Sequence, residues 1–295
     1  MKNTPIIVLL SCLFWLTCRQ AWAQVPNTTS GSTNFVNIGG RQLEMATYGQ
    51  GTPTVIVEAG LGEPAVESGS WSSVVNEVAK STRICIYDRA GLGKSDAATN
   101  ALRTSQDVVT DLHTLLVNAK VPPPYILVGH SIGGFVVRLY ASKYPDEVAG
   151  VVLVEATHPD QLSKWLAALP PETANEPESI KGGRKILNAQ MTDPAGNPER
   201  MDFGTSSAQV RAAGSLGAKP LVVLSHSPNW RMGPDLPDDV SRKLEQVSED
   251  LQNDLAHLSS NSTHKSAAKA GLRMQVEDPQ FVVEAILKVV DATRK

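Results

Sequence analysis

The sequence predicts an α/β protein with a mostly parallel central sheet flanked by helices. Short β-branched or apolar runs, such as Thr54–Glu58 and Val148–Val154, alternate along the chain with segments whose apolar residues recur at helical spacing. This alternation is typical of a parallel sheet with helices on both faces. Polar residues also follow several of the runs, and reactive groups in such sheets collect at the carboxyl ends of the strands. The 295 residues suit one large domain or at most two.

The expected strands are short runs bounded by turn residues. The first two form a hairpin, because Gly39 and Gly40 separate residues 35–38 from residues 42–48. The later runs are continuously apolar, which suits strands that are buried on both faces. They comprise residues 54–58, 83–87, 125–128, 148–154 and 221–225, and a weaker strand is expected near residues 263–268.

The expected helices have apolar residues three and four positions apart. Residues 105–119 are an example, with Val108, Leu112 and Leu115 on one face. Other helices are expected at residues 74–79, from residue 133 to about residue 144, and at residues 240–258 and 281–290. Between residues 159 and 219 the alternation stops. Prolines, glycines and short helical pieces (residues 161–169, 179–190 and 206–213) replace it and indicate an inserted cap over the site.

The N-terminus has the pattern of a secretory signal peptide. Lys2 precedes an apolar run over residues 6–16, and Ala21-Trp22-Ala23 forms a small-residue cleavage site. We therefore expect cleavage after Ala23, export to the periplasm or medium, and no stable membrane span afterwards. An uncleaved N-terminal anchor is the alternative. Residues 24–34 are rich in Thr, Ser, Gly and Asn and are expected to be a flexible linker, so the folded domain is expected over residues 35–295.

Composition argues against several kinds of partner. A formal net charge of −3 does not favour nucleic acid or an anionic membrane surface. The cysteine and histidine spacings show no metal-ligand cluster, and we expect neither a metal nor a cofactor. After cleavage only Cys85 remains, so no internal disulfide is expected. No pattern in the sequence indicates an oligomeric state.

The strongest signal in the chain is Gly129-His130-Ser131-Ile132-Gly133, between an apolar strand and a helical segment. Strand, then G-x-S-x-G, then helix is the order that a nucleophile elbow requires. The turn at the serine is strained, so Gly129 and Gly133 must be small enough for strand and helix to pack closely. The elbow exposes the Ser131 hydroxyl at a helix N-terminus, where the backbone N–H of Ile132 and the helix dipole face the same centre.

With these motifs, the chain from about residue 35 onward resembles the α/β-hydrolase family. The resemblance rests on the elbow, on Glu58-Ala59-Gly60-Leu61-Gly62, on residues 87–95 (YDRAGLGKS) and on residues 154–161 (VEATHPDQ). The family includes esterases, lipases, peptidases, dehalogenases and non-enzymes, so the resemblance implies a fold more than a substrate. It also implies that Ser131 is the nucleophile and that the backbone N–H groups of Leu61 and Ile132 form the oxyanion hole.

The acid and the base depart from the family pattern. The acid is expected to be Glu155, at the end of the strand that follows the elbow helix, with Asp235 as the alternative. Near the C-terminus, where the family has Gly-His, this chain has Gly271 followed by Leu272, which cannot accept a proton. A substitute base is therefore expected at a strand end. His226 is preferred, and His158 is the other possibility.

The remaining histidines are expected to have no catalytic role. His113 and His257 belong to helical segments, and His130 is expected to pack under the elbow. His264 is expected to begin the last strand, on the order of 16–20 Å from the catalytic edge of the sheet.

The leading hypothesis is an exported serine hydrolase that acts on carboxylic esters or related small acyl compounds, with Ser131, Glu155 and His226 as its catalytic residues. The alternative is a catalytically impaired protein of the same fold that binds a small ligand or a partner. Leu272 favours this alternative, and the intact elbow argues against it.

Overall fold

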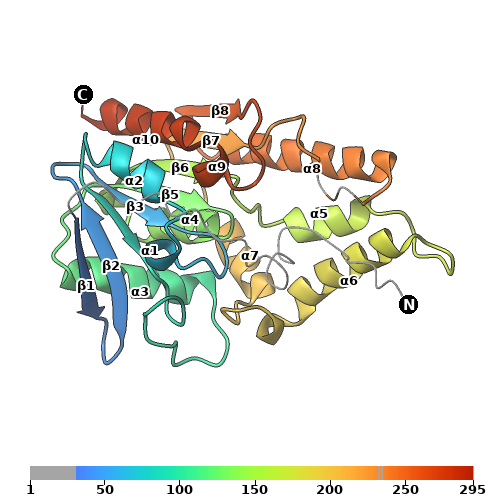
Figure 1. The fold of residues 1–295 in the computed structure, drawn as a ribbon, viewed down its shortest axis with the longest axis horizontal. Coiled ribbons are helices and arrows are strands. Elements are labelled where there is room, and N and C mark those ends of the chain that lie inside the picture. The colour runs from blue at the N-terminus through green and yellow to red at the C-terminus, as the bar shows by residue number, and fades with distance from the viewer. Residues whose placement is uncertain (1–30, 232, 234, 295) are drawn as a thin grey trace, which may run out of the picture.

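The computed structural model describes residues 31–231, 233 and 235–294. Within these residues, eight strands form one sheet in the order β1-β2-β4-β3-β5-β6-β7-β8 (Figure 1). The sheet is antiparallel at β1–β2 and β2–β4 and parallel from β4 to β8, which confirms the predicted fold class. The strands are β1 (Gly31–Asn37), β2 (Gln42–Tyr48), β3 (Thr54–Glu58), β4 (Ile84–Tyr87), β5 (Tyr125–His130), β6 (Val148–Val154), β7 (Leu221–Ser225) and β8 (Ser262–Ser266).

The first strand begins earlier than predicted. β1 starts at Gly31, which pairs with Tyr48 of β2. The prediction of a linker was therefore wrong for residues 31–34, because pairing with β2 supplies main-chain hydrogen bonds that a polar sequence alone does not reveal. The predicted signal peptide (1–23) and residues 24–30 of the predicted linker lie outside the described residues.

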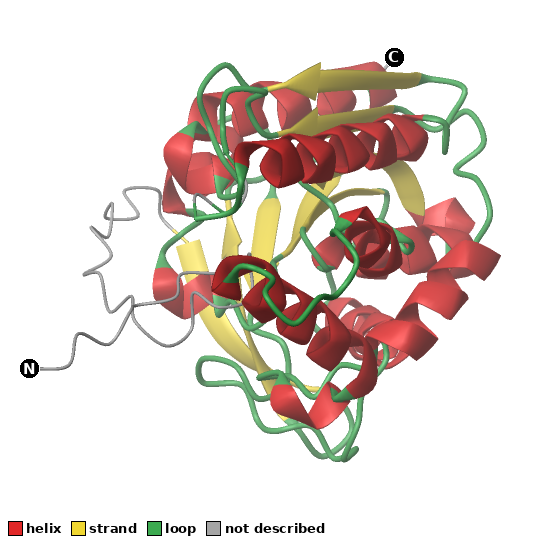
Figure 2. Cartoon of the chain, turned by 90° about the vertical axis from the view of Figure 1, so that its right-hand side faces the viewer, coloured by secondary structure: helices red, strands yellow, loops and turns green. Residues whose placement is uncertain are grey.

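Alternation along the strands divides the core into two layers. In β3, Val55 and Val57 face one layer with α2 (Ser72–Val78) and α10 (Pro279–Thr293), while Ile56 faces the other. The second layer contains α3 (Ser105–Asn118) and α4 (Gly133–Lys143). Successive side chains of a strand point to opposite faces, so apolar runs such as those of β5 and β6 serve both layers. Figure 2 shows helices on both sides of the twisted strands.

The segment between β6 and β7 forms a helical insertion. It contains α5 (Gln161–Ala168), α6 (Glu178–Thr192), the 3₁₀ turn η3 (Pro194–Gly196) and α7 (Phe203–Ala212). Its α5 packs against α8 (Asp238–Ala256), and Trp165, Leu187 and Leu244 belong to a third apolar cluster there. In Figure 1, α5 and α6 lie beside α8 at the end of the molecule away from β1. The remaining helical pieces are α1 (Ala65–Ser68), η2 (Pro145–Glu147) and α9 (Met274–Glu277). Among the described residues, no helix combines the length and the apolar character needed to cross a bilayer.

The turn from β5 into α4 has the strained geometry that the sequence predicts. Ser131 has φ = 52°, in the left-handed region that a residue with a side chain rarely adopts. A Cβ on Gly133 would lie 2.2 Å from the carbonyl oxygen of Glu58, and one on Gly129 would lie 2.8 Å from the carbonyl oxygen of Gly133. Both glycines are therefore required for the close approach of α4 to the strands.

We expect Gly133→Ala to lower the free energy of unfolding by about 3 kcal/mol, since its methyl group would meet backbone that cannot move without shifting β3. Gly204→Ala in α7 is the matched control, because its Cβ would lie 3.4 Å from its nearest neighbour, an oxygen of Asp202. That control should be neutral or stabilising by roughly 0.5–1 kcal/mol. Urea unfolding of the two variants checks this, and equal effects would contradict the close-packing explanation.

Candidate active site

Three neighbouring strands end in one row at the carboxyl edge of the sheet. In the sheet register His130 pairs with Val154 and Val154 pairs with Leu224. The next residues are Ser131 on β5, Glu155 on β6 and Ser225 on β7. Adjacent strands lie about 5 Å apart. Measured across the sheet between backbone positions, Ser131 is therefore about 5 Å from Glu155 and about 10 Å from the end of β7. Glu155, like Ser131, has a positive φ, at 44°.

His226 and Glu155 form a hydrogen-bonded acid–base pair. His226 Nδ1 lies 2.9 Å from Glu155 Oε1, and the His226 backbone N–H donates to Glu155 Oε2 at 2.8 Å. Both side chains are largely buried, and the ring of Trp230 contacts the His226 imidazole edge-on, with 5.0 Å between ring centroids. Burial opposes charging of this imidazole, but the Glu155 carboxylate outweighs it and raises the pKa of His226. Since a carboxylate only accepts, Nδ1 carries the proton and Nε2 is left to act as a base.

The Ser131 hydroxyl makes no hydrogen bond to any described residue. The structure thus pairs two of the three predicted catalytic side chains, Glu155 and His226, and places Ser131 in the same row without a hydrogen bond to His226. Asp235, the alternative acid, is exposed and forms no ion pair within the described part of the chain.

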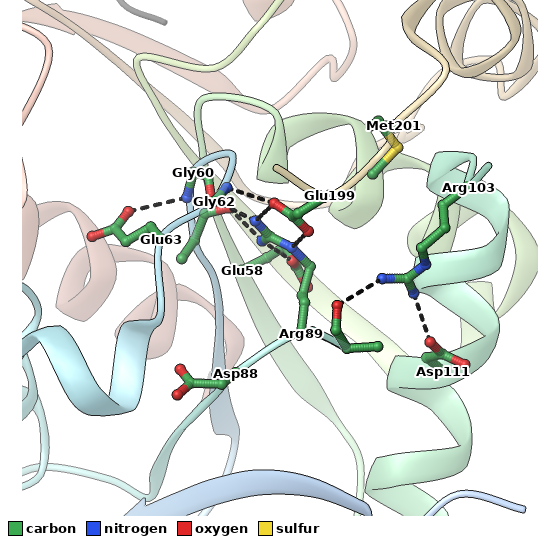
Figure 3. A network of polar contacts seen from close by, with 12 residues as sticks. Glu58, Gly60, Gly62, Glu63, Asp88, Arg89, Arg103, Asp111, Glu199 and Met201 are labelled. Atoms are coloured by element: carbon green, nitrogen blue, oxygen red, sulfur yellow. Dashed lines mark hydrogen bonds and ion pairs between the residues drawn. The ribbon is translucent and has the colours of Figure 1, made fainter. Parts of the chain in front are cut away.

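The loop after β3 leaves one N–H group unpaired at its centre. Gly60 N–H donates to Glu63 Oε2 at 3.1 Å, and Gly62 N–H donates to Glu199 Oε1 at 2.6 Å (Figure 3). Between them, the N–H of Leu61 has no acceptor among the described residues, and neither does the N–H of Ile132 after Ser131. The two backbone groups predicted for the oxyanion hole are therefore both available as donors.

The sequence did not single out the residues that hold this loop. The buried Arg89 guanidinium, just after β4, donates to the Glu58 and Glu199 carboxylates and to the carbonyl oxygens of Ala59 and Gly60 (Figure 3). Arg89 lay within a recognised motif (residues 87–95), which is a signal that could have identified it. Glu199 belongs to the insertion, and nothing near it in the sequence indicates where its side chain lies.

His130, the residue before Ser131, is buried behind the same loop. Its Nε2 lies 2.9 Å from the carbonyl oxygen of Leu272, and its Nδ1 lies 3.4 Å from Glu63 Oε2, an ion-pair contact rather than a well-formed hydrogen bond. Both ring nitrogens thus face acceptors, which favours the doubly protonated imidazolium. Burial disfavours both charged side chains, but the interaction between His130 and Glu63 has the larger effect. It raises the pKa of His130 and lowers that of Glu63 from 4.5 to about 2.

The other possible base, His158, is already engaged on both ring nitrogens. Its Nδ1 accepts from the Asp160 N–H at 3.0 Å, and its Nε2 lies 2.9 Å from Asp254 Oδ2 on α8. Burial lowers the pKa of its imidazole despite the Asp254 contact. No lone pair on His158 is free to take a proton from Ser131.

The position predicted for His264 was wrong. It is the third residue of β8 and pairs with Val223, and its Nε2 lies 2.5 Å from Ser225 Oγ at the end of β7. Two strand residues separate it from the end of β8, about 7 Å. The error arose because the strand begins at Ser262 and ends at Ser266, and therefore leaves His264 nearer the catalytic edge. Its Nδ1 is also engaged, at 2.8 Å from Asn253 Oδ1.

Within residues 31–231, 233 and 235–294, no cluster of three or more His, Cys, Asp or Glu side chains has the arrangement of a metal site.

Comparisons with known proteins agree with this architecture. The family model for the alpha/beta hydrolase fold matches residues 53–180. An uncharacterised protein of Bacillus subtilis, YqjL, is 37% identical over 102 residues, which are 35% of this chain but only 39% of that protein's length. Among solved structures, a thermophilic esterase of Thermogutta terrifontis has a TM-score of 0.57 and 18% identity, covering 90% of this chain and 100% of that chain. A haloalkane dehalogenase variant of Bradyrhizobium elkanii has a TM-score of 0.66 and 14% identity, with coverages of 90% and 98%.

The charges on His130 and Glu63 should make the free energy of unfolding depend on pH. Glu63 has a lowered pKa, so its contribution is present above pH 4.5 and is lost as the pH falls towards 2. His130 has a raised pKa, so its contribution is present below pH 6.5 and is lost as the pH rises through its folded value. We expect Glu63→Gln to cost about 2–3 kcal/mol of unfolding free energy near pH 5.5 and less at either extreme.

The control for this prediction is Glu77→Gln, which breaks an exposed pair with Lys80. Exposed pairs contribute little, so its effect should stay below about 0.5 kcal/mol and should not vary with pH. Denaturant unfolding at several pH values measures both variants, and a Glu63→Gln effect independent of pH would contradict the ion pair.

Proposed function

This chain belongs to the α/β-hydrolase fold family, and on that premise we propose that it is a serine hydrolase acting on carboxylic esters or related acyl compounds through Ser131. The observation that carries the proposal is the row of strand ends. A serine on a strained elbow lies beside a hydrogen-bonded Glu155–His226 pair, and two unpaired backbone N–H groups lie in the adjoining loops. These are a nucleophile, a base with its orienting acid, and donors for a developing oxyanion.

In the acylation step Ser131 Oγ attacks the acyl carbon while its proton passes to His226 Nε2. The imidazolium that forms is stabilised by the Glu155 carboxylate, which holds the Nδ1 proton. The negative charge that develops on the former carbonyl oxygen is accepted by the N–H groups of Leu61 and Ile132. The carbon–oxygen bond to the leaving alcohol then breaks, and His226 returns its proton to that alcohol.

In the deacylation step the same groups act on a water molecule. His226 Nε2 takes a proton from water as the water oxygen attacks the acyl–Ser131 carbon, and the same two N–H groups again accept the oxyanion. The proton then passes to Ser131 Oγ as the acid leaves. Catalysis requires the Ser131 hydroxyl to turn towards His226, a contact that catalytic groups often complete only with substrate bound.

The choice of an ester substrate rests on the chemical groups of the site rather than on the shared fold. Two N–H donors beside a serine suit a tetrahedral intermediate of acyl transfer. A solved esterase of the same fold supports this choice without deciding it, since a haloalkane dehalogenase shares the fold as well.

We also propose that the protein is exported. The charged start, the apolar run and Ala21-Trp22-Ala23 support this. N-terminal sequencing of protein from cells should show a mature chain that begins at Gln24. A full-length chain in the membrane fraction would instead indicate an uncleaved anchor.

Fluorophosphonate labelling tests the nucleophile. We expect the folded protein to label rapidly and Ser131→Ala not to label. Ser225→Ala is the matched control, because that neighbouring serine also contacts a histidine, His264, and its loss should leave labelling intact. No labelling of folded wild-type protein would contradict the proposal and favour a binding protein of the same fold.

Substitution of the proposed base gives a second test. With p-nitrophenyl acetate, we expect His226→Gln to lower kcat/KM by roughly 10³-fold or more, because the serine loses its proton acceptor. His264→Gln, which alters a histidine one strand away, should change it less than threefold.

Leu272→His should give no large gain if His226 already serves as the base. A gain of 100-fold or more would mean that the base was missing, and it would favour a catalytically impaired wild-type protein.

A further inference from the structure

Glu199 reaches from the insertion into the loop that follows β3. Its Oε1 accepts from the Gly62 N–H at 2.6 Å and from Arg89 at 2.7 Å, and its Oε2 accepts from Arg89 Nε at 2.7 Å (Figure 3). The Glu199 side chain is fully buried, and that of Arg89 is only 3% exposed. A side chain of the insertion thus binds the backbone of the loop that carries the Leu61 N–H.

The segment around Glu199 is itself fastened to the body of the domain. Arg103 donates its backbone N–H to the Arg200 carbonyl at 3.0 Å, and Asp202 donates its N–H to the Arg103 carbonyl at 2.7 Å, which makes a short parallel bridge. The Arg103 side chain in turn pairs with Asp111 of α3 at 2.6 Å (Figure 3). Glu199 is therefore held in place by its own main chain and does not depend on the loop for its position.

Arg89 has two buried carboxylate partners, since it also pairs with Glu58 at 2.7 Å. Burial raises the pKa of Glu58 although Arg89 opposes it, and the pKa of Glu199 is lowered because Arg89 and the Gly62 N–H outweigh its burial. A second buried carboxylate carries a desolvation cost. What Glu199 adds in return is the hydrogen bond to the loop backbone.

The result is a loop whose peptide groups are fixed on both sides of Leu61. Arg89 holds the carbonyl oxygens of Ala59 and Gly60, and Glu199 holds the N–H of Gly62. Peptide planarity then leaves little freedom for the Leu61 N–H between them. An oxyanion donor acts best when its direction is fixed before the reaction begins.

We propose that Glu199 is a positioning residue of the oxyanion hole, through which the insertion holds the Leu61 N–H in its donating orientation. The expected effect of Glu199 on kcat rests on the proposed function, whereas its expected effect on the order of the loop after β3 does not. Glu199 touches no reacting atom and acts through Gly62 and Arg89.

The kinetic test uses Glu199→Ala in the full chain with p-nitrophenyl acetate. Arg89 keeps Glu58 as its partner in this variant, so no unpaired buried charge is created. We expect kcat to fall roughly 10–100-fold with KM within about twofold of wild type, since a misdirected donor weakens transition-state binding more than substrate binding. Glu199→Gln keeps an acceptor for the Gly62 N–H and should recover at least half of this loss on a logarithmic scale.

Glu176→Ala is the matched control. Glu176 is a carboxylate of the insertion whose side chain is 6% exposed, and it pairs with Arg184 at 3.1 Å away from the loop after β3. This variant should keep kcat within about twofold. An equal loss of kcat in Glu176→Ala and Glu199→Ala would overturn the proposal, because it would indicate a general effect of destabilising the insertion.

Hydrogen exchange separates this inference from the proposed function. By mass spectrometry, we expect a peptide spanning residues 59–63 to exchange at least tenfold faster in Glu199→Ala than in wild type, with the elbow peptide unchanged. This result is expected even if wild-type protein proves inactive on esters, which would contradict only the proposed function. Unchanged exchange in the loop, or faster exchange with unchanged kcat in an active enzyme, would overturn the role of Glu199. If Glu199→Ala does not fold, Glu199→Met, which fills similar space without a carbonyl or carboxylate acceptor for the Gly62 N–H, is measured in its place with the same expected results.

Discussion

The buried guanidinium of Arg89 connects the parts of the protein that the candidate site requires. A guanidinium keeps its charge in a protein interior, so a buried one must find acceptors there. Arg89 finds them on the end of β3, on the loop that follows it and on the insertion. Elements that are distant in the sequence, Glu58 and Glu199 among them, are thereby held at one point of the sheet edge. The loop that offers the Leu61 N–H is shaped as a consequence.

The proposed acid–base pair lies one strand away from the place that the family pattern gives these two groups. There the acid often follows the strand after the cap and the histidine follows the last strand. Here His226 follows β7 and Glu155 follows β6, and the sequence pattern predicts Leu272 at the usual histidine position. The parallel register makes this possible, because neighbouring strands end in one row and a side chain from either can reach the same space. Leu272 instead contributes its carbonyl oxygen to His130.

Two buried carboxylates, Glu63 and Glu199, take up the N–H groups on either side of Leu61. Each is balanced by a cation from another part of the chain, His130 for Glu63 and Arg89 for Glu199. Removal of either cation would leave a buried carboxylate uncompensated, which is far more costly than the loss of an exposed pair. Stability and the direction of the Leu61 N–H therefore depend on the same contacts. An engineered change that relaxes this loop is expected to affect both.

The sequence by itself determined the parallel sheet, the elbow at Ser131 and the presence of polar residues at the strand ends, because these follow from local periodicity and from glycines at fixed spacing. It also identified Glu155 and His226 as candidates, since both directly follow apolar runs. Only the tertiary structure decided that these two pair with each other, that His158 is engaged by Asp254, and that His264 lies near the catalytic edge. The start of β1 and the contact of Glu199 with the loop after β3 likewise could not be predicted from the sequence. Such contacts join residues up to 137 positions apart, and no local pattern encodes which distant side chain will satisfy a buried polar group.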